Sequence, residues 1–136
     1  MIIEEVTPGI IQADSEGAIE AYRTRVERNI GGFVNVAFDI EQEYPGVAFL
    51  RLMLNDDLPV PAEWFDRAIS FQKGISATGQ KTLVHCRAAV NRSTAVIAAM
   101  MVAWGMPLEE ALRKLPRKPY SAVTLGSLRE WAAARL

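Results

Sequence analysis

The sequence contains only one cysteine and one histidine among its 136 residues. A single cysteine, Cys86, excludes an internal disulfide and any zinc site built from several cysteines. A single histidine limits Cys/His and Ser/His catalytic pairs to those in which His85 itself takes part. These two counts leave few kinds of catalytic chemistry open.

Long apolar runs are also missing from the chain. The longest one, residues 95–104, has ten residues, whereas a helix that crosses a membrane needs about 20. The N-terminus carries Glu4 and Glu5 where a signal peptide has a basic region followed by an apolar stretch. We therefore expect a cytoplasmic protein without a membrane segment.

The chain has no excess of basic side chains, since 15 lysines and arginines stand against 16 acidic residues and the net charge is −1. This balance argues against nonspecific nucleic-acid binding, which depends on a basic surface. Half of the residues are apolar, and a chain of this length has room for one core. We expect a single domain over residues 1–136, because no repeat, low-complexity tract or linker interrupts it.

Short apolar runs alternate with helical patterns along the chain. We expect strands at residues 10–13, 33–37, 49–54 and 82–85, and helices over residues 61–79, 93–104 and 107–115 and from Thr124 onward. Apolar residues at spacings of three and four from Ile19 to Ile30 indicate a further helix, with Gly31 as its end. The helix that ends at Trp104 is apolar on all sides and should be buried. The alternation predicts an α/β fold with a central, mostly parallel sheet.

Residues 85–93 carry the most informative pattern, His-Cys-Arg-Ala-Ala-Val-Asn-Arg-Ser, between an expected strand and a buried helix. Ligands bind at the carboxyl ends of strands in such sheets. The N–H groups of a tight loop, the start of the next helix and the forked donor of Arg92 favour a phosphate dianion. The same positive field favours the thiolate of Cys86, and Ser93 is placed to hydrogen-bond that sulfur. We interpret the following residues as a phosphate-binding loop: Arg87, Ala88, Ala89, Val90, Asn91 and Arg92.

This pattern resembles the Cys-x5-Arg-(Ser/Thr) signature of the dual-specificity branch of the protein tyrosine phosphatase superfamily. The similarity extends over nearly the whole chain. It implies a sheet of about five strands flanked by helices, and a hydrolase that cleaves phosphomonoesters through a phosphocysteine intermediate on Cys86. It also implies no metal or other cofactor, a supporting role for His85, and phosphorylated proteins or small phosphomonoesters as substrates. In proteins these substrates are phosphotyrosine and also phosphoserine or phosphothreonine.

A phosphatase of this kind needs a carboxylic acid that protonates the leaving oxygen and then activates water. Asp56 and Asp57 follow the third expected strand, 30 and 29 residues before Cys86, where the resembling family places its acid. The Asn-Asp step favours Asp56, and Asp57 stays open as the alternative. The low-molecular-weight tyrosine phosphatases are excluded, because they carry the loop at the N-terminus and the acid near the C-terminus.

One departure from the family pattern is Ala89, where glycine is usual. If this position needs a positive φ angle, alanine strains the loop. A non-catalytic phosphate-binding module of the same fold therefore stays open. Phosphatases of RNA 5′-ends, phosphoinositides or sugar phosphates also stay open, although Arg87 is the only loop cation besides Arg92, and the lipid-cleaving relatives add lysines there.

A basic run around two prolines includes Arg117 and Lys118. Such a run is either a solvated helix end, where cations complement the helix dipole, or a substrate rim that binds a second phosphate or an acidic flank.

Overall fold

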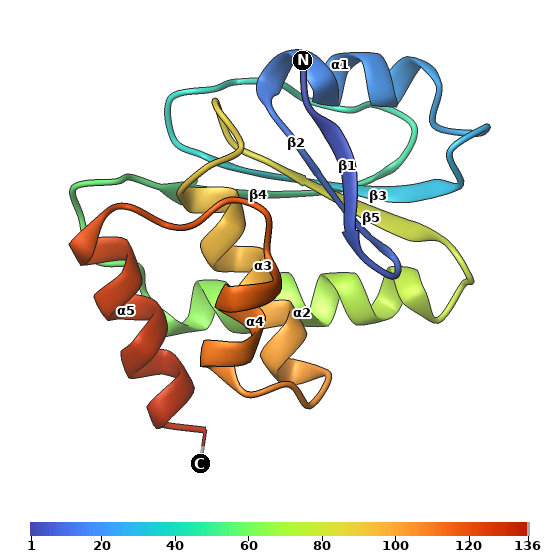
Figure 1. The fold of residues 1–136 in the computed structure, drawn as a ribbon. Coiled ribbons are helices and arrows are strands. Elements are labelled where there is room, and N and C mark those ends of the chain that lie inside the picture. The colour runs from blue at the N-terminus through green and yellow to red at the C-terminus, as the bar shows by residue number, and fades with distance from the viewer. Residues whose placement is uncertain (136) are drawn as a thin grey trace.

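The computed structural model describes residues 1–135 and contains one five-stranded sheet in the order β1-β2-β5-β3-β4 (Figure 1). The strands are β1 (Ile3–Thr7), β2 (Ile10–Ala13), β3 (Ile30–Ala37), β4 (Ala48–Leu54) and β5 (Lys81–His85). Only β1 runs antiparallel to its neighbour, while β2, β5, β3 and β4 pair in parallel. The expected α/β fold with a mostly parallel sheet of five strands is therefore confirmed.

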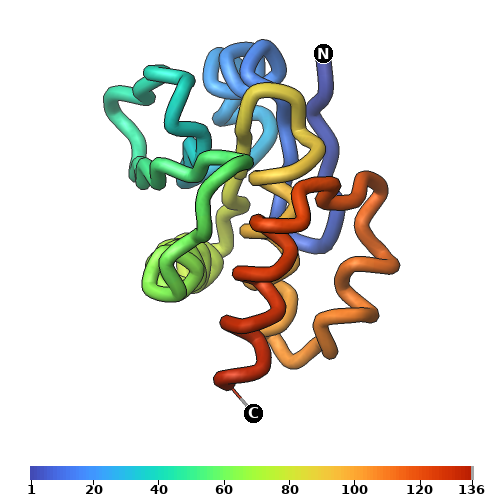
Figure 2. The backbone as a smooth tube through the Cα atoms, turned by 90° about the vertical axis from the view of Figure 1, so that its left-hand side faces the viewer, coloured from blue at the N-terminus to red at the C-terminus, as the bar shows by residue number. Residues whose placement is uncertain are grey.

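The sheet lies between two helical layers (Figures 1 and 2). One face is covered by α1 (Ser15–Arg23), and the other by α2 (Ala62–Ser76) and α3 (Arg92–Ala103). The helices α4 (Leu108–Lys114) and α5 (Ala122–Ala133) pack against α3. None of the helices in residues 1–135 is long and apolar enough to cross a membrane.

The helix α3 is buried on all sides, as its uniformly apolar sequence predicts. Ten consecutive residues from its first position, Arg92, to Met101 are buried. Trp104, which follows the helix, is 57% exposed, so the expectation that it belongs to the core is wrong. The indole is amphipathic, and its Nε1 donates to Gln72 Oε1 at 2.6 Å at the protein surface.

The segment between β2 and β3 differs from the expected long helix. The helix α1 ends at Arg23, Ile19 and Val26 are exposed, and Ile30 already belongs to β3. Gly31 is not a helix end but a residue of β3, which pairs with β5. A Cβ atom on Gly31 would lie 2.4 Å from Gln80 Oε1. Close packing, rather than helix termination, therefore accounts for this glycine.

Two element starts also differ from the sequence-based expectation. The N-cap of α5 is Ser121, whose Oγ accepts from the N–H of Thr124 at 3.2 Å, so Thr124 lies inside the helix. No apolar run predicts β1, because Glu4 and Glu5 interrupt it. These two acids are tolerated because β1 is an edge strand with exposed side chains.

The carboxyl ends of the parallel strands β5, β3 and β4 lie at one edge of the sheet, on the left in Figure 1. Three loops start there, after Ala37, Leu54 and His85, and the link between α4 and α5 reaches the same edge. Residues that are far apart in the sequence therefore meet at this place.

Candidate active site

The loop that follows β5 carries Cys86, which is 2% exposed. The preceding His85 is fully buried, and its Nε2 lies 2.8 Å from the Tyr44 hydroxyl. Because that hydroxyl accepts from Gln42 Nε2 at 2.8 Å, its own proton is free to go to His85. Burial lowers the pKa of His85 to about 4, against the opposing effects of the Cys86 carbonyl and Asp14. At neutral pH the ring is therefore uncharged and fixes the start of the loop.

A hydrogen-bonded chain runs from the cysteine into the sheet. The Cys86 thiol donates to Ser93 Oγ at 3.2 Å, and the same oxygen accepts from Gln12 Nε2 at 2.8 Å. Gln12 Nε2 also donates to Thr94 Oγ1 at 2.8 Å, and Gln12 Oε1 accepts from Arg117 at 2.7 Å. Since Ser93 Oγ already accepts from Gln12, its proton is available to a sulfur that has lost its own.

The backbone of the loop is held from outside. The Arg87 carbonyl accepts from the N–H of Ser15 at 3.1 Å, and the Ala89 carbonyl accepts from Arg117 Nε at 2.9 Å. Residues 1–135 contain no cis peptide bond, so each N–H points opposite to the carbonyl of the same peptide group. The N–H groups of Ala88 and Val90 are therefore turned toward the inside of the loop, as binding of an anion requires.

Ala89 adopts φ +60°, in the left-handed region that favours glycine. Its side chain is fully buried. The condition under which alanine strains this loop is thus met, and the contact of Arg117 with the Ala89 carbonyl helps to hold that conformation.

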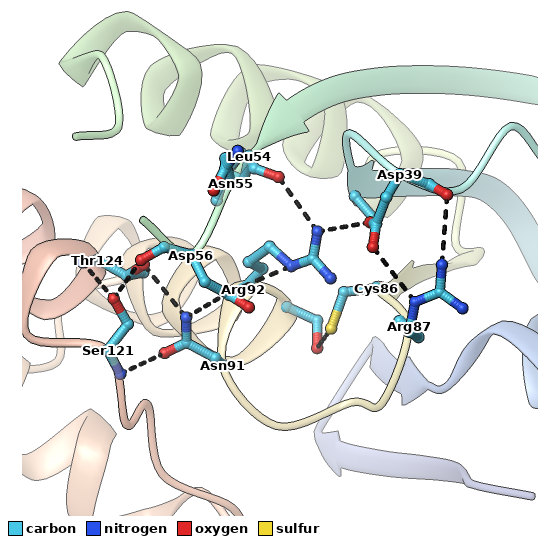
Figure 3. A network of polar contacts seen from close by, with 12 residues as sticks. Asp39, Leu54, Asn55, Asp56, Cys86, Arg87, Asn91, Arg92, Ser121 and Thr124 are labelled. Atoms are coloured by element: carbon cyan, nitrogen blue, oxygen red, sulfur yellow. Dashed lines mark hydrogen bonds and ion pairs between the residues drawn. The ribbon is translucent and has the colours of Figure 1, made fainter. Parts of the chain in front are cut away.

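The guanidinium of Arg92 lies between two acidic side chains (Figure 3). Its Nη1 donates to Asp39 Oδ1 at 2.8 Å and to the Leu54 carbonyl at 3.2 Å, and its Nε lies 3.4 Å from Asp56 Oδ1. Among the described residues, Nη2 has no hydrogen-bond partner. Nη1 is therefore anchored and Nε faces Asp56, while Nη2 remains for a ligand.

Asp39 bridges the two arginines of the loop. Its Oδ2 accepts from Arg87 Nε at 3.2 Å, while Oδ1 binds Arg92. Burial opposes ionisation of this carboxyl group, but the hydrogen bonds and charge of Arg92, with Arg87, hold its pKa below the usual value. Asn35 Nδ2 fixes the turn that carries Asp39 by donating to the Ile40 carbonyl at 2.7 Å.

The two candidate acids lie in different environments. Asp56 is half-buried and accepts from Asn91 Nδ2 at 2.7 Å and from the Tyr120 hydroxyl at 3.1 Å. Asp57 is exposed, and its backbone N–H donates to Asn55 Oδ1 at 2.9 Å. Only Asp56 therefore lies beside Arg92.

Residues 17–129 match the sequence profile of the dual specificity phosphatase catalytic domain. The chain belongs to the dual specificity phosphatase family. No curated protein matches its sequence. Among solved structures, human DUSP28 is similar with a TM-score of 0.87 and 22% identity, over 99% of this chain and 95% of that one.

Two further structures share the dual specificity phosphatase fold with this chain. A mouse putative dual specificity phosphatase complexed with zinc tungstate is similar with a TM-score of 0.85 and 22% identity, over 97% of this chain and 87% of that one. The human tyrosine phosphatase-like serine/threonine/tyrosine-interacting protein is similar with a TM-score of 0.83 and 22% identity, over 98% and 97% of the two chains. At these identities the likeness shows the fold alone.

Arg117 and Lys118, for which a solvated helix end and a substrate rim stayed open, both turn away from the loop opening. The guanidinium of Arg117 is engaged with the Ala89 carbonyl, Gln12 and Glu4, and so supports the loop from behind. Lys118 Nζ donates to the Arg113 carbonyl at 2.9 Å and to two further carbonyls at the end of α4. Its position is that of a cation at a helix C-terminus.

Sequence reasoning missed several contributors to this candidate site. Gln12 is a buried amide within an apolar strand, and that break in the pattern was a signal that it has a specific partner. Asp39 follows the carboxyl end of β3, where ligand-binding residues gather in parallel sheets. Tyr120 gave no signal, because nothing in the sequence places the link before α5 beside Asp56.

Within residues 1–135, no group of three or more histidine, cysteine, aspartate or glutamate side chains is arranged to hold a metal ion.

Proposed function

We propose that this chain hydrolyses phosphomonoesters through a phosphocysteine intermediate on Cys86. The observation that carries the proposal is one contact: Asp56 Oδ1 lies 3.4 Å from Arg92 Nε. Arg92 stands at the end of the loop that starts at Cys86. A nucleophile and a forked cation from one loop thus share a site with a carboxyl group from a distant segment. The family assignment, with its phosphorylated substrates, supports the same chemistry.

In the first step the Cys86 thiolate attacks phosphorus, and the bond between phosphorus and the ester oxygen breaks. The inward N–H groups of the loop and the free side of Arg92 bind the equatorial oxygens, where charge is concentrated in the transition state. Asp56, protonated at this stage, gives its proton to the leaving oxygen. The products are the free alcohol or phenol, the phosphocysteine and the Asp56 carboxylate.

In the second step the Asp56 carboxylate takes a proton from water, whose oxygen attacks phosphorus. The bond between sulfur and phosphorus breaks, inorganic phosphate forms, and the electron pair returns to Cys86. Ser93 stabilises the departing thiolate, because its proton is free to hydrogen-bond the sulfur at 3.2 Å. Asp56 is protonated again, so the enzyme returns to its starting state.

For the substrates we propose phosphotyrosine and also phosphoserine or phosphothreonine in proteins. Two arginines, Arg87 and Arg92, provide the charge of the loop, and Asp39 pairs with both. This partial neutralisation favours a single phosphate group over the clustered phosphates of inositol lipids. We also infer that the catalytic domain spans the whole chain, because Glu4 in β1 contacts Arg117 behind the loop.

A second candidate is a non-catalytic phosphate-binding module of the same fold. The left-handed Ala89 favours it, since an L-residue other than glycine in this conformation costs roughly 1–2 kcal/mol. A strained loop can still direct its N–H groups at a bound phosphate, but we infer that it fits the geometry of the transition state less closely.

Hydrolysis of an aryl phosphate separates the two candidates. We expect turnover by the wild type and none by Cys86→Ser. The variant should still bind tungstate, an oxyanion that takes the place of phosphate, as measured by calorimetry. Serine is nearly isosteric with cysteine, but its hydroxyl stays protonated at neutral pH and is a far weaker nucleophile than a thiolate. Tungstate binding by a wild type that shows no turnover would favour the non-catalytic module. Equal turnover in wild type and Cys86→Ser would exclude a phosphocysteine.

A further inference from the structure

The carboxyl group of Asp56 accepts hydrogen bonds from two segments besides its own loop, and Figure 3 shows the one from Asn91. Asn91, in the phosphate-binding loop, donates to Oδ1 at 2.7 Å. Tyr120, in the link between α4 and α5, donates its hydroxyl proton to Oδ2 at 3.1 Å. Ser121 Oγ donates to the Asp56 backbone carbonyl at 2.6 Å, so both ends of this residue are held.

The two carboxylate oxygens of Asp56 are not equivalent. Oδ1 faces the amide of Asn91 and, at 3.4 Å, the guanidinium of Arg92, which never gives up its proton. Oδ2 has the hydroxyl of Tyr120, a group that can both donate and accept. A proton on the carboxyl group is therefore placed on Oδ2, because Oδ1 is surrounded by obligatory donors.

We propose that Tyr120 is a positioning residue for Asp56, and that its hydroxyl holds Oδ2 in the orientation from which the proton reaches the leaving oxygen. This inference rests on the proposed hydrolase function. When Oδ2 gives its proton to the leaving group, a carboxylate forms, and the Tyr120 hydroxyl donates to it. The hydrogen bond is stronger to this carboxylate than to the protonated acid, so it favours the proton transfer.

Asn91 couples Tyr120 to the phosphate-binding loop. Its Oδ1 accepts from the backbone N–H of Tyr120 at 3.0 Å and of Ser121 at 3.1 Å. Its Nδ2 donates to Asp56, so one buried amide fixes both the acid and the residue that orients it. Tyr120 is 69% exposed. Its position is therefore set by the hydrogen bond of its backbone N–H to Asn91 rather than by packing.

Because the side chain of Tyr120 is exposed, Tyr120→Phe removes one hydroxyl group and leaves the packing of the core unchanged. We expect kcat for phenyl phosphate to fall about tenfold, the usual size of one hydrogen bond to a charged group. For a phosphate with a strongly acidic phenol as leaving group we expect a change of less than about twofold, since protonation matters little there. KM and tungstate affinity should stay unchanged.

Tyr22→Phe is the matched control. It also removes one tyrosine hydroxyl, which here donates to the Pro45 carbonyl. Tyr22 lies on α1, and its ring packs against Tyr44, but its hydroxyl contacts neither Asp56 nor the loop that carries Cys86. We expect wild-type kinetics with both substrates. In an Asp56→Asn background, Tyr120→Phe should have no further effect on kcat, because the group that it orients is gone.

The outcomes separate the two proposals. A wild type that turns over both substrates, with Tyr120→Phe slowed equally on both or on neither, would overturn the role of Tyr120 and leave the hydrolase function intact. An additive effect of Tyr120→Phe in the Asp56→Asn background would also overturn it. A wild type without turnover on any aryl phosphate overturns the hydrolase function and the role of Tyr120 with it.

Discussion

Asp39 at the end of β3 and Arg92 at the start of α3 form an ion pair of 2.8 Å, although 53 residues separate them in the sequence. The pair fixes Nη1 of the arginine and leaves its other side for a phosphoryl group. It also places a carboxylate beside an Arg92 side chain that is only 7% exposed. Removing a charged partner from a buried cation is costly, so the pair stabilises the folded protein.

Asp39→Asn should therefore destabilise the ligand-free protein by about 1–3 kcal/mol, because it removes the charged partner of Arg92 Nη1 and leaves Asp56 as the one carboxylate beside this guanidinium. An added oxyanion replaces that charge. We expect tungstate to raise the melting temperature of Asp39→Asn by more than that of the wild type, as measured by scanning calorimetry. Asp57→Asn, which removes an exposed carboxylate away from both arginines, should behave like the wild type. Equal tungstate shifts in Asp39→Asn and wild type would contradict this account.

Asp56→Asn should lower kcat for phenyl phosphate about 100-fold or more, the usual contribution of a general acid. The loss should shrink as the leaving phenol becomes more acidic, which a series of substituted aryl phosphates measures. Asp57→Asn serves as the comparison, and we expect it to keep wild-type rates because its side chain is exposed. The reverse result for the two variants would assign the acid to Asp57.

Ala89→Gly should leave the free energy of unfolding unchanged within about 1 kcal/mol, as judged by urea denaturation. Relief of the left-handed strain is offset by the greater freedom of glycine in the unfolded chain. The neighbouring Ala88 has no positive φ, so Ala88→Gly gains no relief and should lose about 0.4–1 kcal/mol. We expect Ala89→Gly to raise kcat/KM, since the relaxed loop holds its N–H groups closer to the phosphoryl oxygens. A lower rate would show that alanine suits this loop.

The site was predictable where its residues are neighbours in the sequence. The spacing of Cys86, Arg92 and Ser93 lies within one loop and one helix start, so local geometry fixes it. Asp56 was chosen over Asp57 through family resemblance, and the structure places Asp56 beside Arg92. For Arg117 the sequence left a helix end and a substrate rim open, because its charge is visible in the sequence, whereas its partner, the Ala89 carbonyl, is a backbone group that no sequence pattern marks.

The helices and strands, too, were predictable where a local sequence pattern determines them and not where distant contacts do. Periodicity predicted α2 and the buried α3, because each has a regular apolar pattern over more than ten residues. It failed between β2 and β3, where Ile19 and Ile30 share a helical spacing by coincidence. Pairing of β3 with β5, as between Ile30 and Lys81, makes the last part of that segment a strand. Contacts between distant residues override local patterns at such places.

His85 makes the stability of the folded protein depend on pH. Burial lowers its pKa to about 4 in the folded protein, whereas an unfolded chain has the ordinary value of 6.5. Between these values the unfolded state binds a proton that the folded state does not, so stability is full above pH 6.5 and is lost as the pH falls toward 4. From pH 7 to pH 5 we expect a loss of about 2 kcal/mol in the free energy of unfolding.

This chain allows a clean measurement of that loss, because His85 is its only histidine. The lowered pKa values of Glu5 and Asp39 act in the same sense but at lower pH: each carboxylate stabilises the fold above its unfolded pKa and loses that contribution only below about pH 4.5. Urea denaturation at pH 7, 6 and 5 therefore reports on the histidine. His85→Gln, whose amide has no proton to gain in this range, should be less stable at pH 7 because Tyr44 loses its ring partner, but its stability should stay nearly constant down to pH 5. A wild type and a variant that lose stability in parallel between pH 7 and 5 would show that His85 is not the group that senses pH.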